Sequence, residues 1–357
     1  QEKVFKNIDG IKFLYHQGGC GGTREDTEIL LRLLAGYVNH ANVAGATVLS
    51  LGCQHAQIDW FKQIQLKLYP KTKKPVIYLD QQTLMSEKKL ITAALDETLV
   101  ELAKVNIISR KPARLDNLIV GLECGGSDGF SGITANPAVG VTSDLIVAAG
   151  GSTILSEFPE LNGVEQNIID RCMTVEIAEK FIKLQQSYES RARLIGSGFN
   201  MNPSPGNIKD GLITDAIKSA GAVKKSGNSP VSDILDYAEP VSKPGLNLLC
   251  TPGNDVESTT GLAGSGANII LFTTGLGTPT GNPIVPVIKI SSNTALYNKM
   301  NDIIDFDAGM IIEEKSSINA VGEILLEKII AVASGEKTKA MELEQNDFIP
   351  WKRGISL

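Results

Sequence analysis

The stretch GLECGGSDGFSG, residues 121–132, concentrates reactive side chains among glycines. Glu123, Cys124, Ser127, Asp128 and Ser131 supply two carboxylates, a thiol and two hydroxyls within nine residues. Carboxylates can hold a hard cation or act as acid and base, and hydroxyls can hydrogen-bond a substrate. A simple turn that Asp128 caps would explain one of these side chains and leave the others unexplained. We therefore predict that Glu123 and Asp128 are catalytic and that Ser127 and Ser131 bind substrate.

Two other cysteines lie in glycine-containing loops with a histidine nearby. HQGGCGG places His16 and Cys20 four residues apart, and GCQHAQ contains Cys53 and His55. Thiol and imidazole ligands suit iron or zinc, so His16, Cys20, Cys53 and Cys124 are candidate metal ligands, and His55 is a candidate ligand or base. Spacing alone favours the simpler alternative, a glycine turn with a buried thiol and a surface histidine.

Three further loops carry polar residues. They are NPSPGN (202–207), TPGND (251–255) and FTTGLGTPTGNP (272–283). Asn207, Asn254, Asp255, Thr274 and Thr278 of these loops are predicted to contact substrate, although Asp255 could instead cap a helix. GLGTPTG matches the GxGxxG pattern only loosely and no acidic partner follows it at the usual distance, so no nucleotide site is predicted.

The elements that must position these loops alternate along the chain. Short apolar runs predict strands at 11–15, 46–51, 75–79, 117–122, 152–156, 246–250, 268–273 and 285–290. Helical periodicity predicts helices at 24–38, 86–104, 163–193, 209–219, 255–265 and 316–334. This alternation is typical of an α/β fold with largely parallel sheets flanked by helices in Rossmann-like layers. Loops after parallel strands gather at one edge, where we expect those of Cys20, Cys53 and Cys124.

The chain is long enough for two subdomains. We predict a first α/β subdomain at 1–112 and a second at 113–357, because SRKPARLDN around residue 112 is charged and contains a proline. The second would carry the ECGGSD, NPSPGN, TPGND and TTGLGT loops.

Composition narrows the class of protein. The 357 residues are 42% hydrophobic and 21% charged, as in ordinary globular proteins, and the net charge is −6. This acidity, together with the lack of a long basic run, argues against nucleic-acid binding. The sequence contains no run of about eighteen apolar residues, so it predicts no membrane span. Five cysteines without a CxxC pair favour a reducing cytoplasm. Because Gln1 is not an initiator methionine, we expect the chain to begin inside a longer protein or to have been processed.

Several long motifs carry a resemblance to a known family. They are HQGGCGG, TEILLRLLAGYVNHANVAGATVLSLGCQ, GLECGGSDGFSGITANPAVG, NPSPGN, TPGNDVESTTGLAGSGANIILFTTGLGTP and IDFDAG. In this order they resemble the altronate/galactarate dehydratase family of sugar-acid dehydratases, which includes the large subunit of sulfolactate sulfo-lyase. The resemblance runs from about residue 11 to residue 310, and the tail continues it.

The resemblance implies a metal-dependent hydro-lyase. An aldonate such as altronate, or an aldarate such as galactarate, would lose its C2 proton and its 3-hydroxyl and give a 2-keto-3-deoxy acid. The family is associated with Fe(II) or Mn(II). Relatives carry a small N-terminal domain, so the resemblance implies that such a domain or a small subunit completes this chain. Whether the chain forms a homo-oligomer is left open by the sequence.

Two positions depart from the family pattern. Gln54 stands where relatives commonly carry Glu, and Leu276 stands where they commonly carry Arg. Leu276 cannot clamp a carboxylate as an arginine can, so substrate specificity is expected to differ. Two alternatives stay open: a lyase that eliminates sulfite from a sulfolactate-like acid, and a non-catalytic fragment that binds sugar acids.

Overall fold

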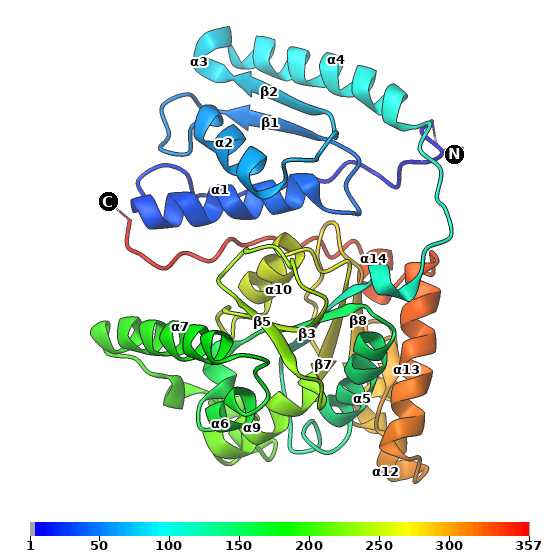
Figure 1. The fold of residues 1–357 in the computed structure, drawn as a ribbon. Coiled ribbons are helices and arrows are strands. Elements are labelled where there is room, and N and C mark those ends of the chain that lie inside the picture. The colour runs from blue at the N-terminus through cyan, green and yellow to red at the C-terminus, as the bar shows by residue number, and fades with distance from the viewer. Residues whose placement is uncertain (1–3, 357) are drawn as a thin grey trace.

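The computed structural model describes residues 4–356 and contains two separate sheets, drawn one above the other in Figure 1. The smaller sheet pairs two parallel strands, with α4 on one face and α1 and α2 on the other (Figure 1). Its elements are α1 (Arg24–Asn39), β1 (Ala46–Ser50), α2 (Ile58–Leu68), β2 (Val76–Asp80), α3 (Gln81–Leu84) and α4 (Glu87–Val105).

The larger sheet has seven parallel strands in the order β5-β6-β4-β3-β7-β8-β9. The strands are β3 (Ile119–Cys124), β4 (Ser152–Leu155), β5 (Val231–Leu235), β6 (Gly245–Leu249), β7 (Ile269–Thr274), β8 (Val287–Ser291) and β9 (Phe306–Asp307). The predicted α/β class with parallel sheets and flanking helices is confirmed.

Helices cover both faces of the larger sheet (Figure 1). They are α5 (Ala135–Ala148), α6 (Glu165–Ile169), α7 (Val175–Leu194), α8 (Pro205–Lys209), α9 (Asp215–Ala222), α10 (Asp255–Gly264), α11 (Thr294–Lys299), α12 (Met310–Glu313), α13 (Ile318–Ala333) and α14 (Lys339–Glu342). Along β7 the core contacts alternate: Ile269 and Leu271 pack in the cluster of α5 and α13, whereas Ile270 and Phe272 pack in that of α10 and α1. This alternation follows from the pleat of a strand.

Helix α1 joins the two parts. One side of it packs on the small sheet through Leu31 and Val38, and the other packs on α10 through Leu33 and Tyr37. The two helices cross at glycines, where a Cβ built on Gly36 would lie 2.0 Å from the carbonyl oxygen of Gly264. Only glycine permits this approach.

The C-terminal segment holds the two parts together. It runs between them in Figure 1, where it is red. The backbone N–H of Arg353 donates to Asp26 Oδ1 of α1 at 2.7 Å, and its guanidinium pairs with Asp236 at 2.5 Å. The Trp351 ring lies 4.9 Å from that of Tyr188 in α7.

Several predicted elements differ from the structure. The prediction of a strand at 11–15 is wrong. Within residues 4–356 this segment pairs with no strand, and Phe13 and Tyr15 are exposed. The helix predicted at 163–193 is two helices, separated before the capping residue Thr174. Helix α5 was not predicted, because its small residues hide the periodicity. Gly140 is one of them, and its Cβ would lie 2.2 Å from the carbonyl oxygen of Lys224.

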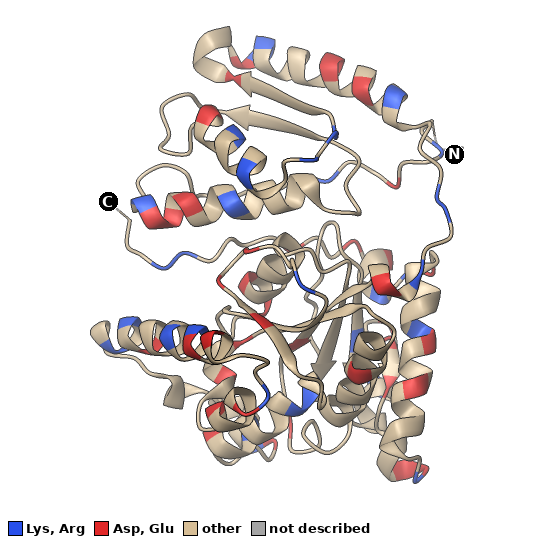
Figure 2. Cartoon of the chain, viewed as in Figure 1, with Lys and Arg blue, Asp and Glu red and all other residues tan. Residues whose placement is uncertain are grey.

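Charged residues of both signs are mixed along the outer helices α7 and α13 (Figure 2). Within residues 4–356, no helix is long and apolar enough to cross a membrane.

Substituting Gly36→Ala should lower the free energy of unfolding by about 1–3 kcal/mol, because the added methyl group forces α1 away from α10. Gly206→Ala is the matched control, since its Cβ would meet only Ser204 Oγ at 3.7 Å. Denaturant melts measure both. Equal stability of Gly36→Ala and the parent would show that the crossing tolerates a side chain.

Candidate active site at the carboxyl ends of the central strands

A cavity of about 520 Å³ opens near the carboxyl end of β3. After β6 the chain crosses to the other side of β3 to form β7, and ligands of open parallel sheets bind at such switch points. Polar side chains from distant parts of the sequence line the cavity, among them Cys124, Glu160, Ser197, Asn202, Ser204, Asn207, Lys218 and Asp255.

The last two residues of β3 face opposite sides of the sheet. Gly121 faces Leu262 of α10, whereas Leu122 packs in the cluster on the other face. By alternation, Glu123 points toward α10 and Cys124 points away from it. Cys124 lines the cavity, whereas Glu123 is fully buried and is outside its lining.

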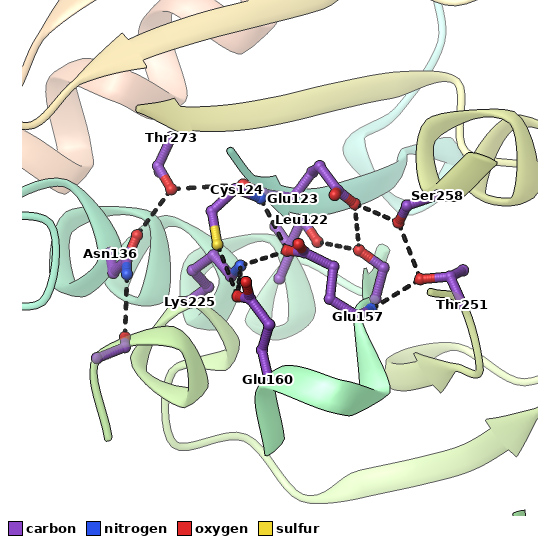
Figure 3. A network of polar contacts seen from close by, with 12 residues as sticks. Leu122, Glu123, Cys124, Asn136, Glu157, Glu160, Lys225, Thr251, Ser258 and Thr273 are labelled. Carbon is purple, nitrogen blue, oxygen red and sulfur yellow. Dashed lines mark hydrogen bonds and ion pairs between the residues drawn. The ribbon is translucent and has the colours of Figure 1, made fainter. Parts of the chain in front are cut away.

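An acid–lysine cluster lies beside Cys124 and consists of Glu157, Glu160, Lys218 and Lys225. Figure 3 shows Glu157, Glu160 and Lys225 of this cluster. Lys225 Nζ lies 2.8 Å from Glu157 Oε2 and 3.9 Å from Glu160 Oε2. Lys218 Nζ lies 2.7 Å from Glu160 Oε1. Buried charges are tolerated when they are paired, and here two carboxylates face two ammonium groups.

The charges of the cluster control the protonation of Glu160 and of the neighbouring Cys124. Burial opposes ionisation of Glu160, but Lys218 and Lys225 lower its pKa to about 2. Burial, followed by the charges of Glu157 and Glu160, raises the pKa of the Cys124 thiol well above its usual value. The thiol therefore keeps its proton, and Sγ donates to Glu160 Oε2 at 2.9 Å.

Glu157 has a strained backbone. Its φ of 67° lies in the left-handed region, which residues other than glycine seldom adopt. Its N–H donates to Thr251 Oγ1 at 2.8 Å, and its carboxylate accepts the N–H of Cys124 at 2.9 Å. Strain held in place by such contacts is concentrated at functional sites.

Glu123 lies in a hydroxyl network on the α10 side of β3 (Figure 3). Ser156 Oγ lies 2.8 Å from Leu122 O and 2.5 Å from Glu123 Oε2. Ser258 Oγ lies 2.5 Å from Glu123 Oε2 and 2.9 Å from Thr251 Oγ1. The contacts outnumber the hydroxyl protons, because Thr251 Oγ1 also lies 3.1 Å from Pro252 O. A proton on Glu123 would add one more donor to this network.

The electrostatics of Glu123 also favour its protonated form. Burial, followed by the charge of Glu157, raises the pKa of Glu123 well above its usual value. Glu123 therefore favours its protonated form within this hydroxyl network. It links β3 through Ser258 and Thr251 to the backbone of Glu157.

Asp255 supplies another carboxylate to the cavity. It is the first residue of α10, which Asn254 caps. A Cβ built on Gly125 would lie 2.5 Å from Asp255 Oδ2, so this glycine of the ECGG motif makes room for the carboxylate. Burial raises the pKa of Asp255, with a further contribution from the charge of Glu160 and opposition from the Thr278 hydroxyl. A raised pKa suits a group that takes and returns a proton.

Asp128 organises its own loop. Its Oδ1 accepts the N–H and hydroxyl of Ser131 at 2.9 and 2.8 Å and the hydroxyl of Ser292 at 2.7 Å. Asn293 donates to Oδ2 at 3.1 Å. Neither Asp128 nor Ser131 is among the described residues that line the cavity.

Of the other residues predicted to contact substrate, some line the cavity and others lie outside its lining. Asn207 lines the cavity and donates to the carbonyl of Ser127 at 2.8 Å, so it also anchors the ECGGSD loop. Thr278 Oγ1 contacts Asp255 Oδ2 at 3.3 Å. Thr274 Oγ1 accepts the N–H of Gly277 at 2.9 Å, which stabilises a turn. Asn254, whose side chain caps α10, and Thr274 lie outside the cavity lining.

The predicted histidine and cysteine ligands of the first part lie in two adjoining loops. Ala56 N donates to Gly19 O at 3.1 Å, which places the His16–Cys20 loop beside the Cys53–His55 loop. All four of these side chains are exposed, and none lines the cavity. Cys53 follows a strand of the two-stranded sheet, so the expectation that the Cys20, Cys53 and Cys124 loops share one sheet edge is wrong.

The structure places the two residues that depart from the family pattern in different regions. Gln54 remains in the loop after β1, where Nε2 donates to Ser50 Oγ at 2.6 Å. Leu276 lines the cavity.

One group among the described residues could hold a metal ion. The ligand atoms of Cys124, Glu157 and Glu160 lie within 4.8 Å of one another. A thiol with two carboxylates suits a divalent transition metal. Glu157 Oε1 is buried without a hydrogen-bond partner and offers a free acceptor. The donor chemistry therefore fits a metal, although Lys225 already balances part of the charge.

Sequence reasoning missed all four residues of the acid–lysine cluster. Glu157 and Glu160 follow the predicted strand 152–156 directly, so the rule that ligands gather at strand ends could have identified them. Lys218 and Lys225 had no such signal, because lysines in short helical segments are typical of surfaces.

Two family models match this chain. The family model described as D-galactarate/Altronate dehydratase, C-terminal, matches residues 115–356. The model described as D-galactarate dehydratase/Altronate hydrolase, second domain, matches residues 1–106.

Curated relatives were found as well. The chain is 38% identical to altronate dehydratase of Bacillus subtilis (strain 168), over 98% of this chain and 69% of the relative. It is 36% identical to altronate dehydratase of Escherichia coli (strain K12), over 99% of this chain and 70% of the relative. A more distant relative, the (2R)-sulfolactate sulfo-lyase subunit beta of Chromohalobacter salexigens, is 29% identical over 98% of this chain and 88% of the relative.

At neutral pH, infrared spectroscopy should detect the carbonyl band of a protonated carboxylic acid that Glu123→Gln removes, because burial raises the pKa of Glu123 well above its usual value. Glu160→Gln is the control and should leave this band unchanged, since the low pKa of Glu160 keeps it ionised. If Glu123→Gln removes only carboxylate bands, Glu123 is ionised.

Titration with Mn(II) should show an affinity that rises about tenfold per pH unit, because the Cys124 thiol must lose its proton to become a ligand. Cys124→Ser should weaken binding and flatten the dependence on pH. Cys172→Ser, outside the group, is the control. Calorimetry measures both, and unchanged binding by Cys124→Ser would remove this thiol from the metal site.

Proposed function

The chain belongs to the galactarate/altronate dehydratase family and is a hydro-lyase, and on that basis we propose that it removes water from a sugar acid to give a 2-keto-3-deoxy acid. The observation that supports this most directly is the grouping of Lys218 and Asp255 in one cavity. Dehydration of a hydroxy acid needs a cation for the carboxylate and a group that moves a proton, and these residues supply both.

Lys218 is the proposed anchor for the substrate's carboxylate. Its ammonium group is held by Glu160 at 2.7 Å and donates to Asn202 at 2.6 Å, so its position is defined before substrate binds. Removal of the proton beside the carboxylate places negative charge on the carboxylate oxygens. A preorganised ammonium group stabilises that charge.

Asp255 is the proposed acid–base group. Its ionised form takes the proton from C2, which breaks the C–H bond. The same carboxyl group, now neutral, gives that proton to the 3-hydroxyl as the C3–O bond breaks and water leaves. The enol product then becomes the keto acid by a proton shift in solvent. One residue therefore accounts for the proton in both steps.

A divalent ion held by Cys124, Glu157 and Glu160 would, when bound, withdraw negative charge from the carboxylate and 2-hydroxyl. Fe(II) or Mn(II) is the proposed ion, because a thiol with carboxylates suits either better than Ca²⁺ or Mg²⁺. The identity of the metal stays a prediction.

Glu123 and Asp128 enter the proposal as supporting residues rather than as groups that meet substrate. Glu123 holds the backbone that presents Glu157, and Asp128 holds the loop that contains Gly125. A role for His16, Cys20, Cys53 or His55, for an added N-terminal domain or small subunit, and for the cytoplasm as location stays a prediction.

Asp255→Asn should lower kcat on a sugar-acid substrate by about a hundredfold or more, because the amide cannot carry the proton. Glu123→Gln is the matched control and should retain turnover within a few-fold. In the parent, kcat/KM should rise with pH through the raised pKa of Asp255, since the base must be ionised. In Asp255→Asn this rise of kcat/KM with pH should be absent.

Assays on altronate, galactarate and sulfolactate with Mn(II), or with Fe(II) under anaerobic conditions, provide the measurement. Loss of turnover in Glu123→Gln, with Asp255→Asn active and both folded, would reverse the two roles. Turnover of sulfolactate alone would point to sulfite elimination.

A further inference from the structure

The NPSPGN loop brings the side chain of Asn202 to the cavity. Asn202 ends a short 3₁₀ turn (Phe199–Met201), and its backbone N–H donates to Phe199 O at 3.1 Å. Its backbone is extended, with φ of −105° and ψ of 123°, as the following Pro203 favours. On the other side of the proline, a capping box at the start of α8 closes the loop. The backbone that carries the Asn202 amide is therefore fixed on both sides.

The amide of Asn202 contacts both members of one ion pair. Its Oδ1 accepts from Lys218 Nζ at 2.6 Å, and its Nδ2 donates to Glu160 Oε1 at 3.3 Å. The same oxygen of Glu160 lies 2.7 Å from Lys218 Nζ. An amide can accept from a cation and donate to an anion at once, whereas an ionised carboxylate can only accept. These two contacts therefore suit asparagine and would not suit aspartate.

The amide holds the ammonium group of Lys218 without cancelling its charge. The acid–lysine cluster has two carboxylates and two ammonium groups, so its charges balance. An ammonium group has three protons, and Lys218 directs two of them to Glu160 and Asn202, which leaves one for a ligand. A second carboxylate in place of the amide would make Lys218 face two anions, and it would repel an anionic ligand.

We infer that Asn202 is a positioning residue for Lys218: its neutral amide fixes the direction of the ammonium group and leaves the positive charge available to the substrate's carboxylate. The inference rests on the proposed function, in which Lys218 anchors that carboxylate. It assigns a role to the NPSPGN loop. Asn202 acts through Lys218, and the role does not require a contact between Asn202 and substrate.

Two substitutions separate positioning from the filling of space. Asn202→Ala removes both amide contacts and should raise KM for altronate, measured with Mn(II), about fivefold. Asn202→Asp keeps the shape but adds a negative charge, and should raise KM about tenfold or more. In both variants kcat should fall less than KM rises, because Asp255 is unchanged. Calorimetric binding of 2-keto-3-deoxygluconate, a carboxylate with no 3-hydroxyl to lose, should follow the same order.

Asn200→Asp is the matched control. Asn200 belongs to the same turn, is exposed and lies outside the cavity lining. This variant adds the same charge two residues away and should keep KM within about twofold of the parent. A KM that rises more in Asn202→Ala than in Asn202→Asp would show that the side chain only fills space, and it would overturn the inference.

A double-mutant cycle tests whether Asn202 acts through Lys218. In the Lys218→Met background, Asn202→Ala should change KM and calorimetric binding by less than about twofold, because the group that the amide positions is gone. Thermal melts check that each variant is folded. If Lys218→Met does not fold, the order of Asn202→Ala and Asn202→Asp decides.

The outcomes of the cycle separate this inference from the proposed function. If Lys218→Met weakens binding and Asn202→Ala weakens it again by the same factor as in the parent, the inference is wrong and the proposed anchor stands. An unchanged KM in Lys218→Met would remove the anchor, and this inference with it. Coupled losses of binding, without turnover of any acid, would contradict the proposed dehydration but support the role of Asn202.

Discussion

Pairing of buried charges at the end of β3 is the constraint on which the site depends. Glu157, Glu160 and Lys225 have side chains that are at most 3% exposed, so none of them could remain ionised alone. Each carboxylate is held by an ammonium group, and Lys218 extends the arrangement into the cavity. The strained backbone of Glu157 is tolerated because these contacts and Thr251 hold it from several sides.

The pleat of β3 divides the chemistry between two faces. Glu123 and Cys124 are neighbours in sequence, yet one joins a hydroxyl network under α10 and the other reaches the cavity. A shift of one residue in the register of β3 would exchange them. The paired strands β4 and β7, which lock this register, therefore determine which side chain can meet a ligand.

The glycines of the ECGG motif serve this arrangement by leaving space for neighbouring groups, and Gly126 also adopts a left-handed φ of 59°. At Gly125 a side chain would collide with the carboxylate of Asp255, and at Gly126 it would crowd Leu276 and Thr274. The motif thus lets α10 and the loop after β7 approach β3. The carboxylate of Asp255 and the side chain of Leu276 come near Cys124 because these backbones are close.

The sequence by itself determined the α/β class, most strand positions and the family, because apolar alternation and glycine motifs are local. It also identified Cys124, Asn207 and Asp255, which line the cavity. It could not place Glu123 behind the sheet, since its direction depends on the pleat and register of a strand paired with partners far along the chain. Nor could it join Glu157 to Lys225, because 68 residues separate them and only the packed fold removes the water that makes their pairing necessary.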